Sequence, residues 1–326
     1  MSFALREAMQ ANVGSIAHDP LRPEFHLMPQ HNWMNDPNGP VWWKGQYHLF
    51  YQLNPHAAVW GDMHWGHAIS PDMIHWRHQP IALAPTPGGP DSEGCFSGSA
   101  VVFDGKPAFI YTGVQNAPPD QATIRDGNDK LRETQLLAIA EDDKLLHWKK
   151  VEKPIIPTPP PGMMVTGFRD PCPWREGDMW YVGIGSGERE VGGCVLLYRS
   201  KDLHRWEYLH KLTQGKPNGK VAVNPCDSGE MWECPDFFGW TDIMCFSIHR
   251  KTRSSGPRAN TTRMNTSTSP CGPAFSIKAL LITRPRALWH QMGGAFCGDG
   301  CERRGLKHSL LLPDGLAPWA FRACSP

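Results

Sequence analysis

Three acidic residues, Asp36, Asp170 and Glu233, lie in short proline-containing motifs at predicted strand starts. Two carboxyl groups can together cleave an acetal bond, because the ionised group attacks the carbon while the protonated group donates to the departing oxygen. If configuration at that carbon is retained, the two groups must lie about 5–5.5 Å apart. The chain has the residues for this chemistry, provided that its fold brings the three motifs together.

The residues around Asp36 favour a charged carboxylate at this position. Pro37 restricts the backbone of Asp36 to an extended region. Asn35 and the Asn38-Gly39 pair supply hydrogen-bond donors and a tight turn, which favour an ionised side chain. Asp36 is therefore the expected nucleophile.

Glu233 has the opposite surroundings. Trp232 and Cys234 place apolar bulk beside it, and two nearby aspartates oppose a further negative charge, so the protonated form is favoured. Asp170 follows Arg169, whose positive charge is expected to keep Asp170 charged. We expect Glu233 to act as acid/base and Asp170 to hold hydroxyls that carry charge in an oxocarbenium-like transition state.

A repeated pattern of strands carries these motifs: a short polar motif, an apolar strand, a glycine-containing turn and an aromatic strand. β-branched and aromatic residues on both sides of such turns predict β-hairpins. A second repeated element predicts a turn and then an outer strand that begins with a buried tryptophan. The first pattern occurs at 35–52, 96–113 and 168–186 and opens again at 232–238, and the second occurs at 70–76, 141–148 and 200–206.

The spacing of the motifs predicts an all-β propeller rather than a sandwich. Asp36, Ser97, Asp170 and Glu233 are 61, 73 and 63 residues apart, an interval that fits four-stranded blades. The innermost strands of such blades converge on one channel mouth. Asp-Pro and Asn-Gly are also ordinary turn formers, but four motifs in phase, with an acid or hydroxyl at the same place in each, favour a shared site.

Five motifs together resemble the signature of glycoside hydrolase family 32, which contains invertases, sucrose-6-phosphate hydrolases and fructan hydrolases. The resemblance implies a five-bladed propeller, of which about three and a half blades are recognisable here, without the C-terminal β-sandwich of the family. It also implies that Asp36 is the nucleophile, Asp170 the transition-state stabiliser and Glu233 the acid/base. The motifs are W-M-N-D-P-N-G (33–39), Y-Q-L-N-P (51–55), F-S-G-S (96–99), F-R-D-P (168–171) and W-E-C-P-D (232–236).

The same resemblance implies a substrate, a β-fructofuranoside such as sucrose, sucrose 6-phosphate or a short fructan, and neither metal nor cofactor. A fructosyltransferase with the same three acids is an alternative, as is a non-catalytic carbohydrate-binding propeller or pseudoenzyme. His64, His67, His75 and His78 lack a standard metal-ligand spacing. The fructose contacts implied by the resemblance are Asn35, Gln52, Trp60, Phe96, Ser97 and Arg169.

The overall composition is that of a globular protein, with 40% hydrophobic and 20% charged residues and a net charge of +1. This balance predicts neither nucleic acid nor a membrane as a partner, and it makes no prediction of oligomeric state. No apolar run suits a secretory signal or a membrane span. The ten cysteines are irregularly spaced, which favours reduced thiols and a cytoplasmic location.

The chain changes character at residue 239. Residues 1–238, the predicted propeller part, hold 21 Lys and Arg against 28 Asp and Glu, whereas residues 239–326 hold 12 against 4. The strand pattern is lost there, and neither alternation nor a hairpin is expected. Synonymous codons for 239–251 and 290–300, read one base out of phase, permit blade-like strands, so we interpret 239–326 as out-of-frame translation of the remaining blades.

Other interpretations of this tail are a basic interaction tail, a divergent domain, or a zinc module built on Cys297, Cys301 and His308. Missing blades would leave strand edges unpaired. We therefore expect the chain as written to be poorly soluble and to have little activity.

Overall fold

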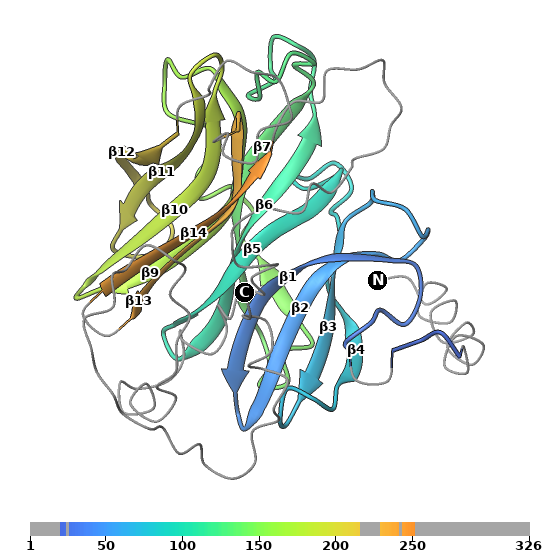
Figure 1. Cartoon of the computed structure of the whole chain (residues 1–326). Helices are drawn as coiled ribbons and strands as arrows, with labels where there is room; N and C mark the ends of the chain where they lie inside the picture. The colour runs from blue at the N-terminus through green and yellow to red at the C-terminus, as the bar shows by residue number, and fades with distance from the viewer. Residues whose placement is uncertain (1–19, 24–25, 216–228, 241–242, 252–326) are drawn as a thin grey trace, which may run out of the picture.

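The computed structural model describes residues 20–23, 26–215, 229–240 and 243–251. These residues form fourteen β-strands and no helix, so none of them belongs to a helix long and apolar enough to cross a membrane. The strands form three four-stranded antiparallel sheets and one two-stranded sheet, each in chain order (Figure 1). The expected all-β class is confirmed.

The sheets divide the chain into successive segments. The first contains β1 (Trp33–Trp43), β2 (Gln46–Asn54), β3 (His64–Ser70) and β4 (Arg77–Leu83). The second contains β5 (Gly94–Phe103), β6 (Lys106–Asn116), β7 (Leu131–Ala140) and β8 (Trp148–Lys150). The third contains β9 (Val165–Glu176), β10 (Met179–Glu188), β11 (Gly192–Ser200) and β12 (Glu207–Gln214), and the fourth contains β13 (Met231–Trp240) and β14 (Ile243–Lys251).

The first strands of successive sheets contact one another: β1 with β5, β5 with β9, and β9 with β13. The sheets are therefore arranged as propeller blades with these four strands innermost, as the repeat predicts (Figure 1). Between the first and second sheets the core buries Phe50, Trp65 and Phe109 completely. A second core, which includes Ile110 and Phe168, joins the second sheet to the third.

Two-residue turns join the innermost strands to their neighbours, as predicted from the glycines. Lys44-Gly45 connects β1 to β2 with φ values of 47° and 83°, and Asp104-Gly105 connects β5 to β6 with 47° and 74°. Two successive positive φ values are typical of a type I′ turn, which matches the twist of a hairpin.

The tryptophan element recurs in all three complete blades with the same contacts. Each turn has an aspartate that accepts backbone N–H groups, and then a residue with positive φ whose carbonyl accepts the indole N–H. The tryptophans are half-buried rather than fully buried as expected, because this bond holds each ring along the turn. The indole contacts are Trp76 to Met73 at 3.1 Å, Trp148 to Leu145 at 3.0 Å and Trp206 to Leu203 at 2.8 Å.

The expectation that no hairpin follows Gly239 is wrong. β13 continues to Trp240 and pairs antiparallel with β14, from Met231 opposite Lys251 to Trp240 opposite Ile243. The physical reason is a short alternation of apolar and polar residues, Phe246-Ser247-Ile248-His249, which is typical of a strand. The predicted changes beyond residue 251 lie outside the described residues.

Candidate active site

Each of the four innermost strands has a β-bulge at its polar motif. The ladders shift between Met34 and Pro37 in β1, and between Phe96 and Gly98 in β5. They shift again between Arg169 and Cys172 in β9, and between Glu233 and Asp236 in β13. A bulge leaves residues outside the regular ladder and redirects their side chains, which explains how strands of four blades present polar groups to one another.

The predicted repeat aligns Glu233 with Asp170, and the bulges show that this alignment is off by one residue. Asp170 and Cys234 both have positive φ, 62° and 46°, and both precede a proline in the bulge. Cys234 therefore occupies in the fourth blade the position that Asp170 occupies in the third, and Glu233 corresponds to Arg169. Acid residues contribute to the site from two successive positions of the repeat rather than from one.

The side chains of Asp36, Asp170 and the residue after Glu233 meet. Ser97 Oγ donates to Asp36 Oδ2 at 2.9 Å. The Cys234 thiol lies 4.0 Å from Asp36 Oδ2 and 3.6 Å from Asp170 Oδ2. The motifs of β1, β5, β9 and β13 therefore converge, as the sequence predicts, although 61 to 73 residues separate successive motifs along the chain.

Asp170 is the buried carboxylate of the group, with 5% of the residue exposed. Its Oδ2 accepts the backbone N–H of Cys234 at 2.9 Å, and its own N–H donates to Thr112 Oγ1 at 3.0 Å. Burial raises the pKa of Asp170 to about 7, opposed by the charge of Arg169 and assisted by that of Glu233. The expectation that Asp170 can remain charged beside Arg169 stays a prediction, and burial opposes the effect of this single neighbouring cation.

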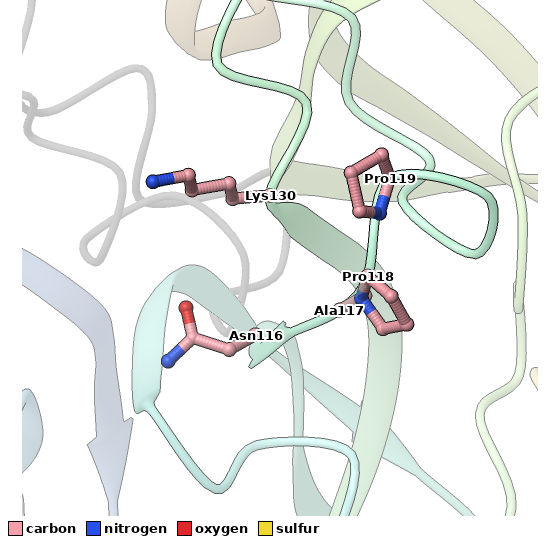
Figure 2. A pocket seen from close by; sticks show the side chains of 5 residues that line it. All are labelled: Asn116, Ala117, Pro118, Pro119 and Lys130. Atoms are coloured by element: carbon pink, nitrogen blue, oxygen red, sulfur yellow. The ribbon is translucent and has the colours of Figure 1, made fainter.

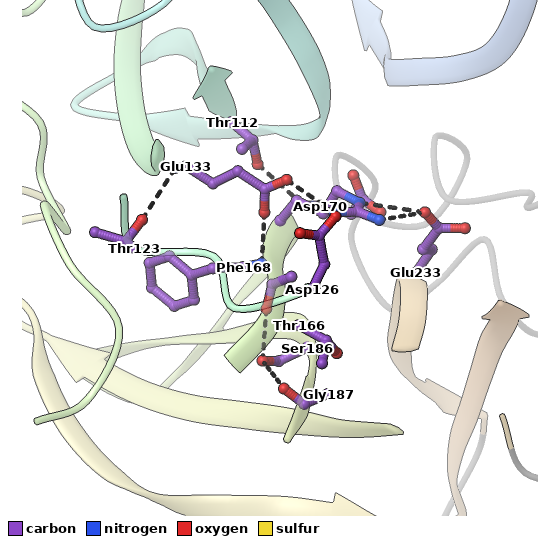
Figure 3. Close-up of polar contacts among 12 residues, drawn as sticks. Thr112, Thr123, Asp126, Glu133, Thr166, Phe168, Asp170, Ser186, Gly187 and Glu233 are labelled. Atoms are coloured by element: carbon purple, nitrogen blue, oxygen red, sulfur yellow. Dashed lines mark hydrogen bonds and ion pairs between the residues drawn. The ribbon is translucent and has the colours of Figure 1, made fainter. Parts of the chain in front are cut away.

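Arg169 connects two glutamates. Its Nη2 and Nε donate to Glu233 Oε1 at 2.7 and 3.2 Å, and its Nη1 donates to Glu133 Oε1 at 2.8 Å (Figure 3). Burial lowers the pKa of Arg169, but the charges of Glu133, Glu233 and Asp170 more than offset this and raise it above its ordinary range. The guanidinium is therefore a fixed positive charge at the centre of three carboxyl groups.

The remaining predicted contact residues lie on the same inner strands or next to them. Gln52 is buried on β2 and donates to the Cys95 carbonyl at 2.9 Å. Asn35 accepts the indole N–H of Trp33 at 2.8 Å. Trp60, between β2 and β3, is 52% exposed and packs edge-on against Phe96, with ring centroids 5.7 Å apart.

Sequence reasoning missed Glu133 and gave Cys234 only a role as apolar bulk. Glu133 belongs to β7, outside the repeated polar motif, and only 1% of it is exposed. A signal was present: Glu133, Thr134 and Gln135 belong to a run of four polar residues, beginning at Arg132, near the start of a strand that is apolar from Leu136 onward. All three are buried, and buried polar side chains in a strand need partners from a neighbouring element.

A separate hollow of about 420 Å³ lies at the open end of the β6–β7 hairpin (Figure 2). It contains one charged side chain and no carboxyl group, so the chemistry of the described residues resides at the inner strands instead. No group of three histidine, cysteine or acidic side chains in the described ranges could hold a metal ion. The hollow is lined by Asn116, Ala117, Pro118, Pro119 and Lys130.

Comparison with known families identifies the arrangement. The model of the glycosyl hydrolases family 32 N-terminal domain matches residues 26–274, which include all four bulged strands. The chain belongs to glycosyl hydrolase family 32. The match extends past residue 238, where the sequence pattern was expected to stop.

Curated relatives from family 32 align over about two thirds of the chain. A sucrose-6-phosphate hydrolase of Escherichia coli is 46% identical over 222 residues, 68% of this chain and 42% of the relative. A raffinose invertase of Escherichia coli is 44% identical over 218 residues, 66% of this chain and 41% of the relative. The chain thus spans less than half the length of these relatives.

Solved family 32 structures have the same fold. A β-fructofuranosidase of Bombyx mori, solved as a mutant in complex with sucrose, has a TM-score of 0.63 and 36% identity. The alignment covers 81% of this chain and 51% of the Bombyx chain. The propeller prediction is confirmed by this similarity together with the blade order.

Proposed function

We propose that this chain carries the catalytic site of a retaining β-fructofuranosidase that hydrolyses sucrose or a related β-fructofuranoside. The observation that carries the proposal is the convergence of Asp36, Asp170 and the Glu233-Cys234 pair from three innermost strands. Relatives named sucrose-6-phosphate hydrolase and raffinose invertase support the substrate class.

In the first step, a carboxylate oxygen of Asp36 attacks the anomeric carbon of the fructosyl unit. The bond from that carbon to the bridging oxygen breaks as Glu233 donates its proton to the leaving sugar. The products are a covalent fructosyl ester on Asp36, a released alcohol and an ionised Glu233. Ser97, which donates to Asp36 Oδ2, leaves the other oxygen, Oδ1, for the attack.

In the second step, Glu233 takes a proton from water, and the oxygen of that water attacks the same carbon. The ester bond to Asp36 breaks, so both carboxyl groups return to their starting forms and configuration is retained. Asp170, held on the N–H of Cys234, would bind sugar hydroxyls whose charge grows in the transition state. Since its pKa is about 7, this support is expected to depend on pH near neutrality.

Two aromatic side chains suit the apolar face of a sugar. The exposed ring of Trp60 packs against Phe96, which directly precedes Ser97. An aromatic surface beside hydrogen-bonding groups is a common arrangement in binding sites for small polar ligands. We propose Asn35, Gln52 and Arg169 as the accompanying polar contacts to the fructosyl unit.

Methanol competition tests the proposal directly. Sucrose is supplied in water with methanol, and products are separated by chromatography and NMR. Double displacement predicts glucose, fructose and methyl β-fructofuranoside. An α-configured methyl product contradicts a retaining mechanism. Absence of glucose release both from the chain as written and from a chain with its reading frame restored contradicts a hydrolase, whereas transfer mainly to a second sucrose would indicate a fructosyltransferase.

We propose separately that residues 239–326 are translated out of frame. Its charge and the codon argument support out-of-frame translation, whereas the β13–β14 hairpin and the extent of the family match do not require it. Sequencing the coding DNA around codon 239 tests it, and expression of a frame-restored chain beside the present one gives the functional comparison. Equal solubility and activity of the two would contradict the proposed frameshift.

A cytoplasmic location is likewise a proposal. Two buried cysteines support it, because Cys95 and Cys194 are free thiols in the structure. Free buried thiols suit a reducing compartment. Fractionation of producing cells, with an assay for the chain in each fraction, tests the location.

A further inference from the structure

Glu133 is a buried carboxyl group beside the site that the proposed reaction does not use. It lies on β7, the third strand of its blade, yet it reaches the innermost strand of the next blade. Its Oε1 accepts Nη1 of Arg169 at 2.8 Å, and its Oε2 accepts the backbone N–H of Phe168 at 2.5 Å (Figure 3). Both oxygens therefore act as acceptors, which suits an ionised carboxylate.

β7 also holds the peptide that precedes Arg169. Gln135 lies two residues from Glu133, and therefore on the same face of the strand. Its Nε2 donates to the carbonyl of Phe168 at 2.7 Å. Since Glu133 accepts the N–H of the same residue, both backbone polar groups of Phe168 are held by side chains of β7. This fixes the backbone from which the Arg169 side chain projects.

Close packing limits Arg169 further. A Cβ atom added at Gly167 would lie 2.8 Å from Arg169 Nη1 and 2.5 Å from Met231 Sδ. No larger residue fits there without displacing one of these side chains. In the structure the guanidinium points Nη1 toward Glu133 and both Nε and Nη2 toward Glu233.

The charges explain why two glutamates share this guanidinium. A buried arginine bonded to one carboxyl group strongly favours loss of the proton from that group. Such a partner would oppose the role of Glu233 as a proton donor. A second carboxylate on the opposite edge offsets the arginine charge, so that Glu233 gains or loses its proton beside a nearly neutral ion pair.

We infer that Glu133 is a positioning residue for the acid/base: it fixes the Arg169 guanidinium against Glu233 and offsets its charge, so that Glu233 can retain a proton at the pH of the reaction. The inference rests on the proposed function for the role of Glu233. The contacts themselves do not depend on that role.

Several other titratable groups belong to the site or to the strand paired with Glu233, and they must stay unchanged in a test. Asp170 accompanies Arg169 on β9, Asp36 faces the site from β1, and Cys234 is adjacent on β13. His249 is the register partner of Glu233 on β14. A substitution at Glu133 leaves all four of these residues in place.

The test is a carboxyl-carbon NMR titration of the full chain labelled with ¹³C-glutamate, in which the signal lost in Glu233→Gln assigns Glu233. In Glu133→Gln, which keeps the shape and removes the charge, the Glu233 midpoint should fall by about one pH unit. An unchanged or raised midpoint would overturn the inference. Because the readout needs no turnover, it holds whether or not the chain hydrolyses sucrose.

Two matched variants complete the test. Glu133→Asp keeps the charge at a slightly greater distance, so the Glu233 midpoint should fall by less than half as much. Glu141→Gln removes one charge from an exposed side chain just beyond the other end of β7 and should not move the midpoint. If Glu133→Gln does not fold, a small fall in Glu133→Asp and none in Glu141→Gln supports the inference, and equal midpoints contradict it.

Turnover gives an independent readout. The alkaline limb of kcat/KM for sucrose should move to lower pH in Glu133→Gln, with KM changed less than kcat, and Glu133→Asp should largely restore it. A uniform loss of kcat at every pH, without a moved limb, would show a merely structural role. Absence of turnover in both the unsubstituted chain and the frame-restored chain would count against the proposed function, while the NMR midpoint still decides the role of Glu133.

Discussion

Two buried charge networks in this chain use similar groups and give opposite results. Away from the site, Asp91 accepts hydrogen bonds from Lys150 Nζ, from the hydroxyl of Tyr111 at 2.9 Å and from the backbone N–H of Thr86 at 3.0 Å. Burial by itself raises the pKa of Asp91, but Lys150 and the hydrogen bonds lower it below its ordinary value. One cation here serves one carboxylate.

At the site, the same balance is reversed. Asp170 is also buried beside a cation, but Arg169 is shared with Glu133 and Glu233. Burial raises the pKa of Asp170 to about 7; Arg169 opposes this rise, and the charge of Glu233 adds to it. The comparison teaches that the number of carboxyl groups per cation, rather than burial alone, separates a network that stabilises the fold from one that holds a proton near neutral pH.

The largest expected effect is on turnover. Asp36→Asn removes the proposed nucleophile and should lower kcat for sucrose by about 10⁴-fold or more. Its half-exposed side chain contacts the Ser97 hydroxyl and, at 4.0 Å, the Cys234 thiol, and asparagine keeps an oxygen for both, so the free energy of unfolding should change little. Glucose release and urea unfolding measure both, and Asp104→Asn, at an exposed turn, is the control. A stable variant with near-normal turnover would remove Asp36 from the mechanism.

The next largest effect is on stability. Asp91→Ala leaves Lys150 without its carboxylate and should lower the free energy of unfolding by about 3 kcal/mol. Asp143→Ala breaks the Lys44–Asp143 pair, whose side chains are 59% and 73% exposed, and should cost less than about 1 kcal/mol. Urea unfolding of both variants tests the contrast, and equal losses would deny the closed network its stabilising role.

A smaller effect should appear in the pH dependence of stability. The pKa of Asp170 is about 7 in the folded chain and 3.8 without the fold, so the folded state binds more protons between these values. Its contribution is fully present below about pH 4 and is lost as pH rises through about 7. Asp170→Asn, which tolerates the positive φ, should reduce this loss between pH 5 and 8 by about 2 kcal/mol. Identical pH curves for both chains would contradict the raised pKa.

The smallest effect concerns a buried pair that includes no ion. His48 Nδ1 lies 3.0 Å from His67 Nε2, and burial lowers the pKa of His48 to about 4. A histidine whose pKa is lowered by folding stabilises the fold above pH 6.5, and this stabilisation is lost as the pH falls toward 4. Urea unfolding at pH 7 and 5.5 should show a loss of about 1 kcal/mol that His48→Gln reduces. A loss of the same size in the variant would assign it to other groups.

Local sequence predicted the blades well, because their signals are local. Turn glycines such as Gly45 and Gly105 and the spacing of Asp36, Asp170 and Glu233 specify hairpins and a common mouth. The β14 hairpin was not predicted, because the alternation that marks this strand is short and follows a change in composition at residue 239.

The charge balance of the site could not be predicted in this way. Arg169 precedes Asp170 in sequence, and adjacency suggested a simple pair. The structure shows that Arg169 also serves Glu133 and Glu233, which are 36 and 64 residues away. How one cation is divided among several acids depends on contacts between blades, which no local pattern encodes.

The bulge that recurs in the four innermost strands has a consequence for how such a site can change over time. It places Asp36, Ser97, Asp170 and Cys234 outside the regular ladder, so their identities are less constrained by strand pairing than those of their neighbours. A mutation at one of these positions can exchange acid, hydroxyl or thiol without rebuilding a blade. New substrate specificities can therefore arise at these bulge positions by single substitutions, while the paired strands that carry them stay the same.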